Sequence, residues 1–360
     1  MEARMSTKCS IRYLLAASMI VLTFSGIDCR RNPVGPPPGA DTTSDNFTWT
    51  QYTFGGQGGS SYFKDVAIVN DTDIWAVGSI YTSPDTMYNA AHWDGVKWSL
   101  LQIPFYTICG QSHITPYAIN TVFAYSGDDI WFSDGGEVVH WVDSSYEHDC
   151  SVGSIINGAI NKIWGTSSAD LYAVGNVGTI IRYSNGTWTQ MPSGTTIDLR
   201  DVWGSSDGSV VWACGYSNDN SQSILLKYDG TSWKTVWSSH PSMPPYGGVI
   251  TSLWGLDSLY LVGTDGAFRE EIGGEDSVQH LFSLRDFPYR IRGSAGNNIA
   301  FVGDDAMIYH YNGSTWKLVN ISTLDQPLYS VAVSKDMIVA IGSDYSVGFG
   351  AALIYVGKRE

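Results

Sequence analysis

The run Asn161-Lys162-Ile163-Trp164-Gly165 is followed by Asp170-Leu171-Tyr172-Ala173-Val174-Gly175, then by Thr179-Ile180-Ile181-Arg182-Tyr183 and by Asn185-Gly186-Thr187-Trp188-Thr189. Each piece is a short β-type stretch, and the gaps hold Gly, Asn, Asp or Ser, which are turn residues. An Asn-Gly or Asp-Gly pair supplies the positive φ angles of a tight hairpin turn. The unit is therefore predicted to be a four-stranded antiparallel meander.

This unit recurs along the chain. An apolar residue of the first strand marks each copy, at Val66, Val122, Ile163, Val202, Leu253, Ile291 and Val331, with spacings of 56, 41, 39, 51, 38 and 40 residues. Several second strands end in an apolar residue and Gly, and third and fourth strands meet at turns such as Trp93-Asp94-Gly95-Val96-Lys97-Trp98. Seven such copies predict an all-β fold, a seven-bladed β-propeller of four-stranded antiparallel blades.

The two ends of the repeat array predict how the ring closes. The last copy has strand-like segments at 329–333, 337–342 and 351–356 but no fourth one, whereas the orphan segment 46–52 resembles a fourth strand. An N-terminal strand that completes the C-terminal blade would leave no free sheet edge. The sequence thus predicts a signal peptide at 1–28, a Pro-rich tether at 29–45 and the propeller at 46–360.

The N-terminus predicts export. Arg4, Lys8 and Arg12 precede an apolar run at 13–27 that is short for a membrane span, and Cys29 and a Pro-rich stretch follow it. This arrangement resembles a bacterial lipoprotein signal, in which the Cys is lipidated and becomes the mature N-terminus. Asp28 fits that signal poorly, so ordinary cleavage after Ser25 and a retained anchor stay open. We expect an envelope or surface lipoprotein that touches the membrane only through its N-terminus, or otherwise a periplasmic or secreted protein.

The repeats resemble those of exported bacterial propellers of the Asp-box and photosystem-II-assembly-factor-like families and, more distantly, kelch repeats. The resemblance extends over nearly all of the chain after residue 46. A full Ser-x-Asp-x-Gly-x-x-Trp Asp-box is missing, and the kelch Gly-Gly pair is replaced by Val-Gly. The resemblance implies the fold alone, because no catalytic residue of these families can be matched to this chain.

Composition excludes several classes of function. Only 15% of the 360 residues are charged, against about a quarter in an average soluble domain. The formal net charge is −15, which becomes −16 without residues 1–28, so binding to a phosphate polyanion is disfavoured and no nucleic-acid partner is predicted.

The sequence contains no known catalytic motif, and no cofactor or metal is predicted. Calcium binding at acidic turns such as Asp128-Asp129 stays an alternative. Trp164, Trp203 and Trp254 are expected in the core between blades, and Arg292 is expected to be either a channel-lining group or a buried hydrogen-bonding anchor. A set of mostly basic third-strand residues, expected not to converge, comprises His92, His140, Arg182, Lys227, Glu270 and His310. Cys109 and Cys150 are candidates for a disulfide, and Cys214 for a buried thiol.

Loop lengths favour one face for recognition. Turns from first to second strand and from third to fourth are nearly all tight, whereas the other two classes of connection carry the insertions and emerge together on the opposite face. Aromatic residues with few charges are typical of recognition surfaces. The predicted binding residues are Tyr81, Tyr88, Phe105, Tyr106, His113, His240 and Tyr246.

The leading functional prediction is a monomeric, non-catalytic binding or assembly module that recognises a protein or glycan on this face. A carbohydrate-active enzyme, a lyase or glycoside hydrolase with its site at the channel mouth, is the alternative. Convergent carboxylates or His residues on that face would favour the enzyme, and a broad aromatic face poor in carboxylates would favour the binding module.

Overall fold

The computed structural model describes residues 42–108, 111, 113–239, 246–256, 258–271, 278–319, 321, 326–346 and 348–360. The predicted signal peptide, most of the tether and Cys29 lie outside these residues.

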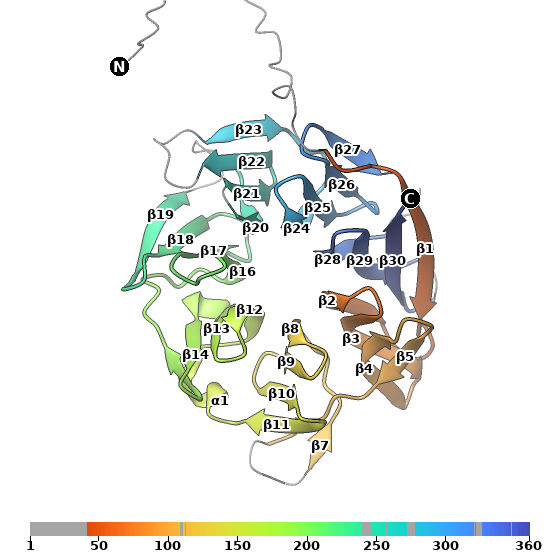
Figure 1. The fold of residues 1–360 in the computed structure, drawn as a ribbon. Coiled ribbons are helices and arrows are strands. Elements are labelled where there is room, and N and C mark those ends of the chain that lie inside the picture. The colour runs from red at the N-terminus through yellow and green to blue at the C-terminus, as the bar shows by residue number, and fades with distance from the viewer. Residues whose placement is uncertain are drawn as a thin grey trace, which may run out of the picture. The chain divides into compact units, whose positions relative to one another are not determined.

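Seven four-stranded antiparallel sheets surround a central axis (Figure 1), which confirms the predicted seven-bladed propeller. In the first three blades after the N-terminal strand, the strands run outward from the axis in chain order. They are β2 (Tyr62–Asn70), β3 (Asp73–Ser83), β4 (Thr86–Trp93) and β5 (Trp98–Leu101); β8 (Thr121–Ser126), β9 (Asp129–Ser133), β10 (Val138–Val142) and β11 (Ser145–Asp149); and β12 (Ile160–Ser167), β13 (Asp170–Gly175), β14 (Ile180–Ser184) and β15 (Thr187–Gln190).

The next three blades repeat this order. They are β16 (Leu199–Gly204), β17 (Val211–Tyr216), β18 (Ser223–Tyr228) and β19 (Trp233–Ser239); β20 (Ile250–Gly255), β21 (Ser258–Gly263), β22 (Gly266–Glu271) and β23 (Gln279–Phe282); and β24 (Pro288–Ala295), β25 (Asn298–Gly303), β26 (Ile308–Tyr311) and β27 (Trp316–Val319). A small hairpin and two short helices lie between strands: β6 (Phe105–Tyr106) with β7 (Ile114–Thr115), α1 (Val152–Ile155) and the 3-10 helix η1 (Asn176–Gly178).

The seventh blade combines both ends of the described chain. Its inner strands are β28 (Leu328–Val333), β29 (Met337–Asp344) and β30 (Ala351–Arg359), and β1 (Phe47–Phe54) completes it. The antiparallel register of β1 with β30 runs without interruption from Phe47↔Arg359 to Phe54↔Ala352. The orphan segment therefore closes the ring, as predicted, and β1 lies beside the C-terminal strand in Figure 1.

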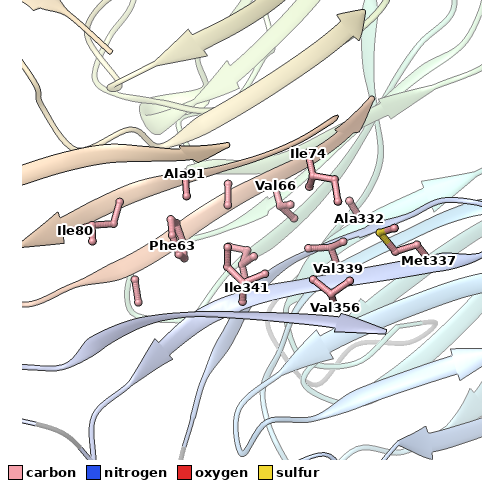
Figure 2. Packing of buried hydrophobic residues seen from close by; sticks show 13 residues of the cluster. Phe63, Val66, Ile74, Ile80, Ala91, Ala332, Met337, Val339, Ile341 and Val356 are labelled. Carbon is pink, nitrogen blue, oxygen red and sulfur yellow. The ribbon is translucent and has the colours of Figure 1, made fainter. Parts of the chain in front are cut away.

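The core consists of apolar layers between neighbouring blades. Figure 2 shows the layer between the closing blade and the blade of β2, where Phe63, Val66 and Ile74 face Val339 and Ile341. Successive apolar side chains point to opposite faces of each sheet, and both faces are apolar because a neighbouring blade covers each of them. The seven marker residues of the repeats, from Val66 to Val331, are at most 5% exposed and belong to these layers.

The apolar-Gly ending of the second strands accommodates an irregularity of the innermost strands. Six innermost strands contain a register shift just before the marker position, for example between Leu199 and Asp201. The glycine opposite that shift has no room for a side chain, since a Cβ on Gly215 would meet the carbonyl oxygen of Asp198. The blade of β8 has Ser133 in place of the glycine and no shift at this position. We infer that the glycine permits the bulge.

Strand direction divides the loops between two faces. Connections from first to second and from third to fourth strand lie on one face, which we call the tight-turn face. The other connections lie on the opposite face, which we call the insertion face. The insertion at 79–90 forms no open loop, because β3 and β4 extend through it as a hairpin that turns at Pro84-Asp85.

Candidate functional site

A belt of polar residues lies in the channel, one residue from each blade. Each member directly precedes the marker residue of its innermost strand, next to the register shift where one is present. A bulge redirects side chains at such a position. The polar belt consists of Asp65, Thr121, Lys162, Asp201, Ser252, Arg290 and Ser330.

One arc of the polar belt is built on Asp65, which is 1% exposed. Its Oδ2 accepts hydrogen bonds from Lys162 Nζ and, at 2.9 Å, from Thr121 Oγ1. Its Oδ1 accepts a bond of 2.9 Å from Ser330 Oγ. Four innermost strands are thereby joined through one carboxylate.

The other arc is built on Asp201, which is fully buried. Arg292 binds it through both terminal nitrogens, with Nη1 2.9 Å from Oδ2 and Nη2 2.7 Å from Oδ1. Arg290 Nη1 lies 2.6 Å from Oδ1, and Ser252 Oγ donates to Oδ2. Arg292 thus fulfils both sequence expectations: it is a buried anchor and it lines the channel cavity.

The charges of the polar belt determine its protonation states. Burial alone would raise the pKa of Asp201, but Arg290 and Arg292 outweigh burial and hold that pKa far below its ordinary value. The pKa of Asp65 is likewise lowered, because Lys162 and Arg290 outweigh its burial. Burial lowers the pKa of Lys162 to about 8, with Arg292 and Arg290 adding to the effect against Asp65. Both carboxylates are therefore ionised at neutral pH.

Cations gather where the channel opens on the insertion face. Arg200 Nη2 donates to Asn218 Oδ1 at 2.6 Å and to Asp198 Oδ2 at 3.1 Å, and its guanidinium lies 5.2 Å from the ring centroid of Tyr216. Arg290 Nη1 donates to the carbonyl oxygen of Arg200 at 3.4 Å. The Nε atoms of both arginines are buried and have no hydrogen-bond partner among the described residues.

Lys64 belongs to the same group of cations. Its side chain is exposed, and its pKa is lowered by desolvation and then by the charges of Arg290 and Arg200. The three cations are therefore close enough to repel one another. Five of the chain's 20 Lys and Arg residues lie in the channel or at its mouth, namely Lys64, Lys162, Arg200, Arg290 and Arg292, although the protein is strongly acidic overall.

Aromatic residues lie beside these cations in what we call the tyrosine arc: Tyr216, Phe287, Tyr289, Tyr329 and Tyr345. Successive rings are in contact, with centroids 6.1 Å apart for Tyr216 and Phe287, 5.2 Å for Phe287 and Tyr289, and 5.3 Å for Tyr289 and Tyr329. The hydroxyl oxygens of Tyr329 and Tyr345 are 2.9 Å apart. Tyr345 is 53% exposed, so the arc is open to solvent at this end.

The structure separates the predicted binding residues. Phe105 and Tyr246 are buried, and Tyr246 donates its hydroxyl to Glu270 Oε2 at 2.6 Å, so neither is offered to a partner as the sequence had suggested. Tyr81 and Tyr88 are half-buried on the extended hairpin of β3 and β4.

The other predicted binding residues belong to the insertions farther along the chain. Tyr106 is half-buried with its ring 4.4 Å from that of His148, and His113 is exposed. His240 lies outside the described residues. The insertion face therefore offers fewer of the predicted aromatics than expected.

The third-strand residues do not form an anion site. Three of them are paired within their own blades, namely His92 Nε2 with Asp73 Oδ1 at 2.9 Å, His140 Nε2 with Asp129 Oδ1 at 2.8 Å and Arg182 Nε with Asp170 Oδ1 at 2.8 Å. The partner in these three blades is the first residue of the second strand, so the repeat itself explains the pattern.

The tryptophan and cysteine predictions have mixed outcomes. Trp164 and Trp254 are buried and Trp203 is half-buried, and both Trp164 and Trp203 line a cavity. Cys214 is a free, buried thiol. Cys150 is disulfide-bonded, but Cys109 lies outside the described residues, so their pairing stays a prediction.

Sequence reasoning missed the polar belt and the mouth cations, yet a signal was present. In all seven copies the residue just before the marker is polar, and the residue before that includes Lys64, Arg200, Tyr289 and Tyr329. The innermost strands of packed blades are expected to carry mainly apolar side chains. A polar residue at the same position of all seven innermost strands therefore indicates a polar channel.

The described residues include neither a metal-binding group nor a membrane-spanning helix. Within them, no group of three or more His, Cys, Asp or Glu side chains is arranged to hold a metal ion. No helix there is both long and apolar enough to cross a membrane.

Similar solved structures support the fold. YCF48 bound to a D1 peptide has a TM-score of 0.62 at 16% identity, over 90% of this chain and 99% of that one. Virginiamycin B lyase from Staphylococcus aureus has a TM-score of 0.60 at 12% identity, over 88% and 100%, and the WD40 propeller domain of Doa1 has 0.60 at 12%, over 88% and 97%. No family model and no curated protein matches the chain. At these identities the likeness shows the fold alone: the chain is a seven-bladed β-propeller.

Proposed function

We propose that the protein is an exported, non-catalytic binding or assembly module that takes an acidic segment of a protein partner at its insertion-face mouth. The observation that carries the proposal is the grouping of Lys64, Arg200 and Arg290 beside the tyrosine arc. Charge-assisted hydrogen bonds from arginine favour carboxylates, and aromatic rings with a polar tip favour contact with a partner.

The acidity of the whole chain sharpens this argument. A net charge of −15 repels an acidic ligand from most of the surface, so a cationic mouth would be a local exception that directs the ligand to the channel. The similar structure of YCF48 carries a bound peptide, which makes a polypeptide the ligand class we favour over a glycan.

The alternative of a carbohydrate-active enzyme requires available carboxylates or histidines at the mouth. Of the carboxylates there, Asp198 pairs with Arg200, and Asp304 hydrogen-bonds to Tyr289. Cations and tyrosines make up the rest of the mouth described above, which favours the binding module. Measurable glycan turnover that is lost with a single carboxylate would instead support the enzyme.

We expect Arg200→Gln to weaken binding of an acidic peptide at least tenfold. Loss of a charged hydrogen bond costs about 1.5–3 kcal/mol, and 1.4 kcal/mol corresponds to a factor of ten in affinity. The probe is a fluorescein-labelled octapeptide of alternating Glu and Ala, titrated by fluorescence anisotropy. The Lys-Ala counterpart is expected not to bind, and salt is expected to weaken the Glu-Ala complex.

Arg182→Gln is the matched control for this titration. Arg182 is also a half-buried arginine paired with an aspartate, but it lies on β14, away from the innermost strands. Equal affinities for the two variants, at unchanged melting temperatures, would contradict a binding site at the mouth.

For localisation, we propose that Cys29 carries a lipid anchor and that the Pro-rich segment behind it acts as the tether. Cys29→Ser is expected to release the protein from membranes and to abolish labelling by a fatty-acid analogue. Unlabelled wild-type protein with unchanged membrane partition would favour ordinary secretion.

A further inference from the structure

The channel contains a cavity of about 420 Å³ at the end opposite the insertion-face mouth. Its lining runs from the middle of the innermost strands to their ends at the tight-turn face, and all seven blades contribute. The outermost lining residues include Tyr125 and Leu256, which are 56% and 45% exposed. The cavity is therefore open to solvent on the tight-turn face, and its volume lies within the range of small-molecule sites.

The walls of the cavity are mostly apolar. The rings of Trp164 and Trp203 have centroids 5.8 Å apart, and Phe123 also lines the space. Val66, Ala332 and other small aliphatic residues complete the wall. Such a surface favours an apolar ligand body, because contact with it removes apolar area from water.

The inner end of the cavity is cationic. Lys162 and Arg292 are the charged residues of its described lining, each 7% exposed, and no carboxylate is among the described lining residues. Their partners Asp65 and Asp201 are at most 1% exposed and belong to the polar belt behind them. The guanidinium of Arg292 lies 5.2 Å from the ring centroid of Trp203, so the charge and the aromatic wall adjoin.

We propose that this cavity binds an apolar molecule that ends in one carboxylate, with the carboxylate at Lys162 and Arg292 and the apolar body between the tryptophans and the aliphatic wall. Burial and the neighbouring charges of Arg292 and Arg290 lower the pKa of Lys162 to about 8 against the opposing effect of Asp65, so an added anion would relieve repulsion among these cations. The site is separate from the insertion-face mouth, and it holds or fails independently of the function proposed above.

The test compares head groups on one tail by isothermal titration calorimetry with the full-length protein. Decanoate, decanol and decyltrimethylammonium are the probes. We expect decanoate to bind with a stoichiometry of one and at least tenfold more tightly than decanol, and the cationic probe not to bind. Equal or tighter binding of decanol, or no binding of decanoate, would overturn the proposal.

A cavity-filling variant localises the binding. Ala124→Phe adds a ring at a half-buried position of the cavity wall without removing a charge, and it is expected to abolish decanoate binding, while Thr187→Phe adds the same ring to the exposed outer strand β15 and should leave binding unchanged. Ala67→Phe, at another half-buried position of the same wall, replaces Ala124→Phe if that variant does not fold. Wild-type affinity in the filled and folded variant would overturn the assignment.

Discussion

Asp201→Asn is expected to lower the free energy of unfolding by about 3–5 kcal/mol at neutral pH, because removal of one partner leaves buried charges uncompensated. Asp201 is the shared acceptor of Arg290 and Arg292, and an amide of the same shape cannot neutralise two guanidinium groups. Urea unfolding measured by tryptophan fluorescence gives the difference.

The control for this variant is Asp207→Asn. Asp207 accepts hydrogen bonds from Ser205 and Ser209 in an exposed turn and has no cationic partner in the polar belt. Its replacement is expected to change stability far less. Equal losses for the two variants would mean that the polar belt does not hold the innermost strands together.

The pH dependence of stability provides a second readout. The pKa of Asp201 and that of Asp65 are lower in the folded protein than the ordinary value of about 4, so the unfolded chain binds more protons in acid. Their contribution is complete above pH 4 and is lost as the pH falls through the folded pKa values. Asp201→Asn should flatten this acid limb of the stability profile.

Removal of the closing strand should be the most damaging change. Deletion of residues 1–54 removes β1, whose Phe47 and Trp49 pack against one inter-blade layer and Tyr52 and Phe54 against another. Large aromatic truncations in a core cost about 3–5 kcal/mol each, so we expect a loss of at least about 5 kcal/mol or failure to fold. The exposed edge of β30 should also promote association.

Deletion of residues 1–41 serves as the control, because it retains β1. A synthetic peptide spanning residues 42–56 should restore cooperative unfolding to the shorter protein, whereas a scrambled peptide should not. If the two truncated proteins unfold alike in urea, or if the peptide has no effect, then pairing of β1 with β30 in the closing blade does not stabilise the ring.

The fold was predictable because it depends on local signals that repeat. Each hairpin carries its own turn residues, and seven copies with nearly constant spacing leave little choice of architecture. The closing strand was predictable for the same reason, since segment 46–52 resembles a fourth strand and the last copy lacks one.

The candidate site was less predictable because it depends on the register of the innermost strands and on how deeply each side chain is buried. Phe105 and Tyr246 lie in insertions of the sequence, yet their rings are buried beside neighbouring blades. Arg200 and Tyr329 lie within strands and were not expected at a recognition surface. Their position follows from the bulge in each of these innermost strands. The alternation of polar and apolar residues along one strand does not show where such a bulge lies.

Photo-crosslinking of the acidic peptide tests the central claim most directly. The Glu-Ala octapeptide with a benzophenone group is irradiated with the full-length protein, and mass spectrometry identifies the modified residues. The proposal predicts adducts at Tyr289, Tyr329 and Tyr345 that disappear in Arg200→Gln. Adducts confined to the outer strands or to the tight-turn face around Tyr125 and Leu256 would contradict it.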